Sequence, residues 1–103
     1  MTMVSSGIHI FAKDTLAVST TSARATIASQ HKGRNVFVFN PSVGVLYANL
    51  GDGTVVATAN DYPIPAGQVR KFVAGEGHTN IALLLSAGTA TATLFYGEGD
   101  PIA

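Results

Sequence analysis

The stretch Arg34-Asn-Val-Phe-Val-Phe-Asn40 decides the fold of this chain. Its four central residues, Val36 to Phe39, all favour strands, and both of the faces on which they alternate are apolar. This pattern is typical of an interior strand that is covered on each side. Pro41 follows, and proline cannot continue a central ladder because it has no amide hydrogen to donate. The stretch therefore predicts a strand inside a sheet.

Further strand patterns lie on both sides of this stretch, whereas apolar residues at helical spacing behind a cap are missing. The predicted strands are residues 7–11, 15–20, 24–28, 34–40, 44–50, 54–59, 69–74, 79–86 and 89–96, the segment 54–59 being a short return strand. Between them, Asn60–Gly67 is expected to be an extended loop, because Pro63 and Pro65 fix its backbone. Because 24–28 continues the alternation of 15–20 and 54–59 is only a short return strand, these ranges amount to seven or eight short strands. At spacings of about 8 to 12 residues, they predict an all-β sandwich or barrel.

The length of 103 residues indicates a single domain with one modest core. Residues 31–103 are expected to form the core of the sandwich, and residues 1–30 an N-terminal arm or edge strands of the same domain. The predicted core residues are Val36, Phe37, Val38, Phe39, Ile81, Leu83 and Leu85. We expect a soluble protein that binds no membrane, because no secretory signal is visible and no apolar run approaches roughly 18 residues.

The chain is poor in charge, since only 12% of its residues are charged and its formal net charge is zero. In an ordinary soluble domain about a quarter of the residues are charged. Such a chain is expected to bury much of its surface against copies of itself or a partner, which favours an assembly component over an enzyme. Its basic residues form no run longer than two, so we expect no nucleic-acid binding, which requires clustered Lys and Arg.

No residue pattern predicts a catalytic, cofactor-binding or metal site. The absence of cysteine excludes disulfides, thiol nucleophiles and thiolate metal ligands. His9, His31 and His78 lie far apart and lack the spacing of metal ligands. The acidic residues fall in predicted turns, where carboxylates mostly accept backbone hydrogen bonds, and no serine stands in a Gly-x-Ser-x-Gly context. We therefore expect no enzyme activity and no cofactor.

Three features follow one another between residues 34 and 99, about two thirds of the chain. The strand Asn35–Asn40 comes first, and Asp61-Tyr-Pro-Ile-Pro-Ala-Gly-Gln68 comes second. Gly88-Thr-Ala-Thr-Ala-Thr93, with the terminal Gly97-Glu-Gly99, comes third. In this order the chain resembles the small β-sandwich structural proteins of tailed bacteriophages, which decorate heads or build tail and fibre parts. The resemblance implies a virion protein, made in the host cytoplasm, with a jelly-roll or immunoglobulin-like fold that is often trimeric.

The sequence thus predicts a virion structural protein, first of all a head decoration or cement protein that stabilises the capsid through multivalent contacts. Its partners would be the major capsid protein or another virion protein, and further copies of itself, with a trimer favoured by the resemblance. A tail or fibre component is the alternative in the same class, and a carbohydrate- or receptor-binding module is the alternative in another. The candidate partner-contact loop consists of Asp61, Tyr62, Pro63, Glu76 and His78.

Overall fold

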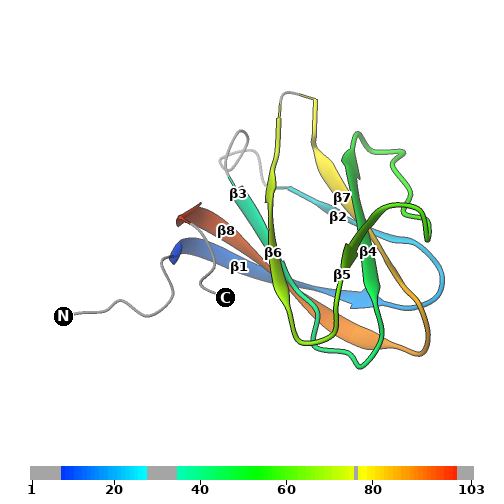
Figure 1. Ribbon diagram of the computed structural model, residues 1–103. Helices are drawn as coiled ribbons and strands as arrows, with labels where there is room; N and C mark the ends of the chain where they lie inside the picture. Colours follow the sequence, from blue (N-terminus) through cyan, green and yellow to red (C-terminus); the bar gives the residue numbers. More distant parts are fainter. Residues whose placement is uncertain (1–7, 28–34, 76, 100–103) are drawn as a thin grey trace.

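Antiparallel strands make up the whole described fold (Figure 1). The computed structural model describes residues 8–27, 35–75 and 77–99, which contain eight strands in two four-stranded sheets. The first sheet has the order β1-β8-β3-β6 and the second the order β2-β7-β4-β5. The strands are β1 (Ile8–Val18), β2 (Ala23–Thr26), β3 (Asn35–Phe39), β4 (Leu46–Gly51), β5 (Tyr62–Ile64), β6 (Val69–Val73), β7 (Asn80–Leu85) and β8 (Ala90–Gly99). The predicted all-β sandwich is confirmed.

The pairing of the strands identifies the sandwich as a jelly roll. β1 pairs with β8, β2 with β7, β3 with β6 and β4 with β5, as in one long antiparallel ribbon that has been rolled up. The additional pairs β3–β8 and β4–β7 complete the two sheets. Eight strands in two sheets with this connectivity form a jelly roll, whereas an immunoglobulin sandwich divides its strands differently.

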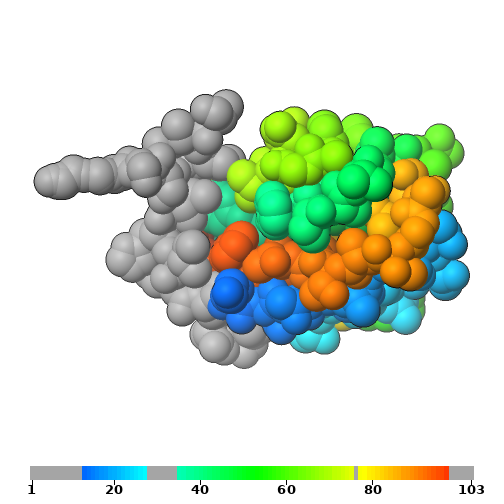
Figure 2. Space-filling view, turned by 90° about the horizontal axis from the view of Figure 1, so that it is seen from below, coloured from blue at the N-terminus to red at the C-terminus, as the bar shows by residue number. Residues whose placement is uncertain are grey.

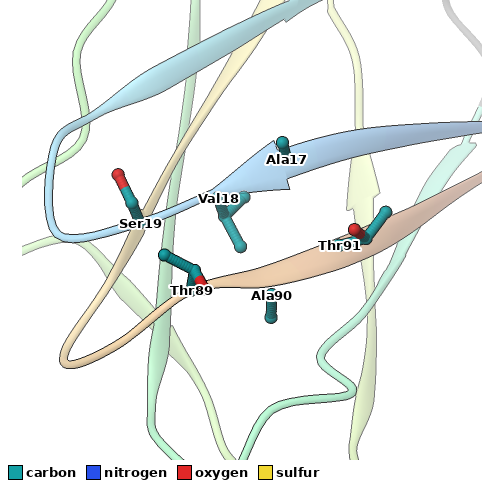
Figure 3. A pocket seen from close by; sticks show the side chains of 6 residues that line it. All are labelled: Ala17, Val18, Ser19, Thr89, Ala90 and Thr91. Atoms are coloured by element: carbon teal, nitrogen blue, oxygen red, sulfur yellow. The ribbon is translucent and has the colours of Figure 1, made fainter.

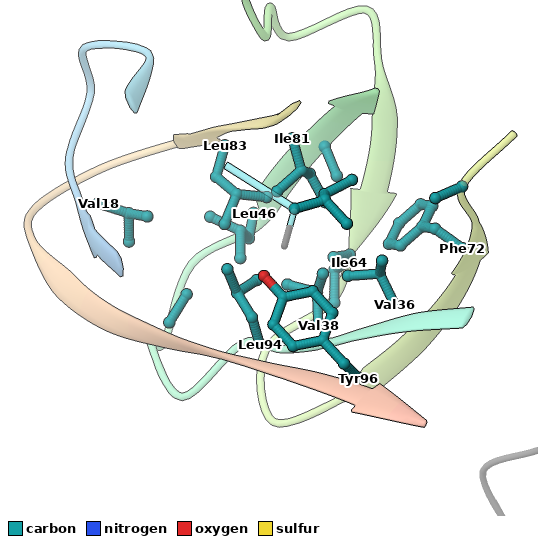
Figure 4. Packing of buried hydrophobic residues seen from close by; sticks show 14 of the residues in the cluster. Val18, Val36, Val38, Leu46, Ile64, Phe72, Ile81, Leu83, Leu94 and Tyr96 are labelled. Carbon is teal, nitrogen blue, oxygen red and sulfur yellow. The ribbon is translucent and has the colours of Figure 1, made fainter. Parts of the chain in front are cut away.

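The hydrophobic core lies between the two sheets (Figure 4). The predicted core residues Val36, Val38, Ile81, Leu83 and Leu85 all belong to it, and each is at most 1% exposed. Further core residues come mostly from alternate positions along the other strands, as the two-residue period of a strand requires. They include Val18, Ile27, Leu46, Ile64, Phe72, Ala92, Leu94 and Tyr96.

Phe37 is fully buried, as the sequence predicts, but it lies outside the cluster between the sheets, and Phe39 is only half-buried. Val36 and Val38 face the second sheet, so the residues that alternate with them lie on the outer face of the first sheet. Phe37 is fully buried on that outer face, beside Phe95 of β8 in register, and Phe39 is half-buried. β3 is thus apolar on both faces, but only one of the faces contributes to the core between the sheets.

The sequence prediction is wrong for residues 54–64. Residues 54–59 form no strand, whereas Tyr62–Ile64, inside the predicted proline loop, forms β5. Pro63 is tolerated in this strand because β5 lies at the edge of the second sheet, where one side of the strand needs no ladder partner. The prolines therefore mark an edge strand and not a loop.

The segment Val55–Ala57 instead lies along the outer face of the second sheet. The Val55 carbonyl accepts a hydrogen bond from Arg24 Nη1 at 3.2 Å, and the Val56 carbonyl accepts one from Asn49 Nδ2 at 3.0 Å. The Ala57 amide donates to Ser22 Oγ at 2.9 Å. These three bonds fasten the connection between β4 and β5 to side chains of the sheet and of the β1–β2 turn.

The N-terminal part of the described chain supplies an edge strand to each sheet. β1 is the outer strand of the first sheet and β2 the outer strand of the second. Val18 and Ile27, at 3% and 2% exposure, belong to the core. Residues 8–27 are therefore part of the sandwich. Residues 1–7 and 28–30 of the predicted arm lie outside the described residues.

The two longest strands extend beyond the predicted limits. β1 runs through residues predicted as two strands and the turn between them, and a register irregularity lies between Ile10 and Ala12. β8 continues through the Gly97-Glu98-Gly99 stretch that the sequence assigns to a turn. Asp14 and Glu98 consequently lie in strands and not in the turns where they were expected. Long mutual pairing explains both extensions, because β1 and β8 are partners from Ile8–Gly99 to Val18–Ala90.

Candidate functional site

Two members of the predicted partner-contact loop, Asp61 and His78, each close a turn of their own. Asp61 Oδ2 accepts hydrogen bonds from the Thr58 amide at 2.6 Å and from Thr58 Oγ1 at 3.2 Å. His78 Nδ1 accepts one from the Gly75 amide at 3.1 Å, and the His78 amide donates to the Gly75 carbonyl at 3.0 Å. Both side chains thus stabilise local backbone. Glu76 lies outside the described residues.

Tyr62 and Pro63, the other two members, lie on β5 and point to opposite faces of it. The Tyr62 side chain is 52% exposed, and its ring meets Phe72 of β6 edge to face, with centroids 5.2 Å apart and planes at 82°. β5 and β6 belong to different sheets and are both edge strands. This aromatic pair therefore closes one side of the sandwich. Pro63 lies opposite Tyr47 of β4 on the outer face.

The structure places Asp61, Tyr62 and Pro63 next to one another at the start of β5, and His78 in the turn between β6 and β7. A further acidic residue, Asp52, has the same local duty as Asp61. Its Oδ1 accepts hydrogen bonds from Thr54 Oγ1 at 2.6 Å and from the Thr54 amide at 2.8 Å. These bonds from Thr54 lower the pKa of the Asp52 carboxyl, because they stabilise its charged form. Carboxylates in these turns therefore act as backbone acceptors.

Asn40 is a buried polar residue whose role the sequence did not indicate. Its side chain is inaccessible to solvent, and its Nδ2 donates to the carbonyls of Ile64 at 2.8 Å and Gly44 at 2.9 Å. Its Oδ1 accepts from Ser42 Oγ at 2.6 Å and from the Ser42 amide at 3.0 Å. Both amide hydrogens and the acceptor oxygen are therefore satisfied. Asn40 thereby joins the connection between β3 and β4 to β5, the strand that carries Tyr62.

A shallow depression lies where β1 ends and β8 begins (Figure 3). Its volume is about 380 Å³, and its lining residues are Ala17, Val18, Ser19, Thr89, Ala90 and Thr91. These side chains are small and uncharged, and Ser19 Oγ takes part in its own turn by accepting a hydrogen bond from the Thr21 amide at 3.2 Å. Acid–base and nucleophilic catalysis require a titratable group or an activated nucleophile. The lining supplies neither, so the depression is suited to contact and not to chemistry.

The outer face of the first sheet continues from this depression across all four strands. Figure 2 shows β1 in blue beside β8 in orange, with β3 and β6 in successive shades of green beyond them. Register places Thr15, Thr93, Phe39 and Val69 in one row across the sheet, and Ala17 and Thr91 in the next. We call these six residues the uncharged outer face. The adjacent row on the same side of the sheet consists of Lys13, Phe95, Phe37 and Lys71, so two lysines flank this area. The alternation of Ala and Thr in β8 produces it, because Ala92 faces the core and the threonines face outward.

Tyr96 is the buried titratable residue of β8, with 3% of its surface exposed. Burial raises the pKa of Tyr96 above its ordinary value of 10.0, because it disfavours the phenolate, and the negative charge of Asp14 raises it further. The folded state therefore holds the phenolic proton more tightly than the unfolded state. The resulting stabilisation is complete below the unfolded pKa near 10 and is lost as the pH rises above it.

We accordingly expect the free energy of unfolding, measured with urea between pH 8 and pH 11, to fall more steeply above pH 10 in the wild type than in Tyr96→Phe. All other titratable groups are the same in both proteins, so the difference between the two slopes isolates Tyr96. Equal slopes would show that the Tyr96 phenol ionises as freely in the fold as in the unfolded chain.

The described part of the chain offers neither a cluster of metal ligands nor a membrane-spanning helix. Within residues 8–27, 35–75 and 77–99, no three His, Cys, Asp or Glu side chains lie close enough together to hold a metal ion. The same ranges contain no helix of the length and apolarity that a membrane crossing demands. No family model, curated protein or solved structure matches the chain.

Proposed function

We propose that this protein is a structural protein of a tailed-bacteriophage virion, and first of all a head decoration or cement protein. The observation that carries the proposal is the uncharged outer face, an area of six residues bordered by Lys13 and Lys71, in a chain with only 12% charged residues. A freely soluble domain usually keeps charged residues dispersed over its surface. A flat surface of Thr, Ala, Phe and Val instead suits contact with another protein, because charged residues are depleted at the centres of interfaces.

In this role the protein would act mechanically. Copies that bind at the junctions between capsid subunits would link neighbouring subunits, and several linked contacts hold more tightly than one. The first sheet is backed along its inner face by the hydrophobic core, and the Asn40 network ties the loops at one end of the sandwich. The outer face would therefore be presented by an ordered sheet that pays little entropy on binding.

A test of the surface uses the substitution Val69→Lys, which places a charge on the uncharged outer face at the β6 side. Burying an unpaired charge in an interface costs well over ~1.4 kcal/mol, so binding to particles that lack the protein should weaken at least about tenfold. The control is Ala66→Lys, which adds the same charge in the exposed turn before β6. Equal binding of the two variants would remove the outer face from the contact.

The location in the virion is tested by quantitative mass spectrometry of purified virions. A head decoration protein is expected in a copy number comparable to that of the major capsid protein. A tail or fibre component, the alternative in the same class, is expected at only a small fraction of that number. Absence of the chain from purified virions would contradict both.

A carbohydrate- or receptor-binding module is the second candidate, and the half-exposed ring of Tyr62 favours it. Jelly rolls occur in lectins as well as in viral capsids, so the fold does not choose between the two functions. Tyr62 already packs edge to face against Phe72, which gives its ring a role in closing the sandwich. A glycan-array signal that disappears in Tyr62→Ala, while the variant remains folded, would establish this second function in place of the first.

A further inference from the structure

β1 offers the longest free strand edge of the described structure. It contains 11 residues and pairs with β8 along one side, and the described residues place no strand along its other side. The pairing with β8 is continuous from Ala12 to Val18, beyond the irregularity that follows Ile10. The amide and carbonyl groups along such an edge can form a ladder with another strand. The Thr15 amide donates to Asp14 Oδ1 at 2.8 Å, so pairing at this residue exchanges that bond for one to the second strand.

The other three edge strands carry features that hinder pairing. β2 has only four residues, and its outward Arg24 is bonded to the Val55 carbonyl. β5 has three residues and contains Pro63, with Pro65 directly after it. β6 carries the adjacent cations Arg70 and Lys71. Short strands, prolines and charges are the means by which proteins keep sheet edges from pairing. β1 also carries two adjacent charges, Lys13 and Asp14, but its segment Thr15–Val18 has no proline, no charge and no bulge. Among the described edges, this segment is therefore the most open to pairing.

We propose that β1 pairs with β1 of a second copy of this chain, antiparallel across a two-fold axis, so that the two first sheets join into one of eight strands. Strand addition of this kind draws its affinity from main-chain hydrogen bonds. An antiparallel edge is complementary to its own copy under a two-fold rotation, which makes a second copy the matching partner. The formal net charge of zero adds no overall repulsion between the copies.

Lys13 and Asp14, in the middle of β1, restrict where the two-fold axis between the copies can lie. An axis through Thr15, Leu16 or Ala17 sets Lys13 and Asp14 opposite uncharged residues of the copy. An axis at Lys13 or Asp14 would instead set like charges directly opposite one another, which is unfavourable. The shallow depression lined by Ala17–Ser19 and Thr89–Thr91 adjoins the same segment and gives room for side chains of the second copy. The pairing therefore centres on Thr15–Ala17.

This inference deepens the proposed function by naming a contact between copies, and it differs from the trimer that the resemblance implies. Pairing of β1 with β1 is complete at two copies, because each chain has one such edge. Sedimentation equilibrium of the full chain is therefore expected to give twice the 10.6 kDa mass of one chain. A monomer or a trimer would overturn the pairing and would leave the proposed virion function untouched, since that function is tested on virions.

Single cysteines can locate the contact, because the natural chain contains none and each new thiol reports only its own neighbours. Thr15→Cys and Ala17→Cys place a thiol on the outward face of β1 without entering the core. Directly opposite Cβ atoms of paired strands lie about 4.5–5.5 Å apart, close to the reach of a disulfide. We expect mild oxidation to give disulfide dimers with one variant alone if the axis passes through its residue. If the axis passes through Leu16, residue 15 of one copy lies opposite residue 17 of the other. Disulfide dimers then form only when Thr15→Cys and Ala17→Cys are mixed in equal amounts.

The matched control is Val73→Cys, at the β6 edge of the same sheet, where the native side chain is 64% exposed. It is expected to give only the background of random collisions. A second experiment measures dimerisation of two lysine variants by sedimentation equilibrium. Ala17→Lys should weaken dimerisation at least about tenfold, because edge lysines oppose strand pairing. Val73→Lys, on the opposite edge strand, should leave dimerisation unchanged. Cross-linking no greater than that of Val73→Cys, or equal dimerisation of the two lysine variants, would refute the β1 contact.

Discussion

Replacing Leu83 by alanine is expected to lower the free energy of unfolding by about 2 to 5 kcal/mol. Leu83 lies on β7 in the core and is inaccessible to solvent. Its neighbours in register are Ala23 on β2 and Ala48 on β4. The substitution would set three alanines side by side, and such short side chains cannot reach into the space that the leucine leaves. The cost of a cavity therefore adds to the lost burial of the side chain.

Urea denaturation measures this loss, and the adjacent leucine provides the control. Leu84 points to the outer face of the second sheet and is only half-buried. Leu84→Ala should therefore cost clearly less than Leu83→Ala. An unchanged denaturation midpoint for Leu83→Ala, or a larger loss for Leu84→Ala, would mean that β7 turns its other face to the core.

Asn40→Ala is expected to destabilise the protein by about 2 to 6 kcal/mol, because it leaves two carbonyls without their donor at a cost of about 1–3 kcal/mol each. The carbonyls are those of Gly44 and Ile64, which accept hydrogen bonds from Asn40 Nδ2. Water cannot easily replace the donor at Ile64, because the bond is buried. Chemical denaturation gives the size of the loss, and proteolysis at the β3–β4 connection reports whether the loop is released.

The control for Asn40 is Asn49→Ala, which removes one exposed hydrogen bond to the Val56 carbonyl. A bond of this kind contributes about 0.5–1.5 kcal/mol at most, so its loss should be the smaller one. Asn40→Asp retains the acceptor for Ser42 but loses both donors and buries a negative charge, so it should destabilise at least as much as Asn40→Ala. Should Asn40→Ala cost no more than Asn49→Ala, the network around Asn40 does not hold the loops.

The strands of the core could be predicted from sequence because their signal is local. Val36-Phe-Val-Phe39 and Ile81–Leu85 combine strand-forming side chains with turn residues at their ends, and both form strands. The rolled-up order could not be predicted in the same way. It depends on pairs such as Ile8 with Gly99, whose separation along the chain leaves no local mark. The prediction of a loop around Pro63 and Pro65 was wrong for a related reason. Proline is compatible with an edge strand, and whether a strand lies at an edge is a property of the whole sheet.

In the candidate surfaces, too, features with a local sequence signal could be predicted and features that depend on distant residues could not. The alternation in Thr89–Thr93 predicts two different faces for that strand, and the position of Leu94 on the alanine side could have shown that the threonines point outward. Asn40 carried no comparable signal, because an asparagine before a proline is equally typical of an ordinary exposed turn. Its importance comes from Ile64, which lies 24 positions further along the chain and reaches Asn40 only in the folded protein.

The pairing of Ile8 with Gly99 determines how the molecule responds to tension. A force that pulls these two residues apart acts at one end of the β1–β8 ladder and across the direction of the strands. The hydrogen bonds of an antiparallel ladder run perpendicular to its strands, so they would be loaded in succession and open like a zipper. A load spread along the length of the strands would instead strain many bonds at once. The folded chain should therefore resist a load applied along these strands far better than a load that peels Ile8 and Gly99 apart.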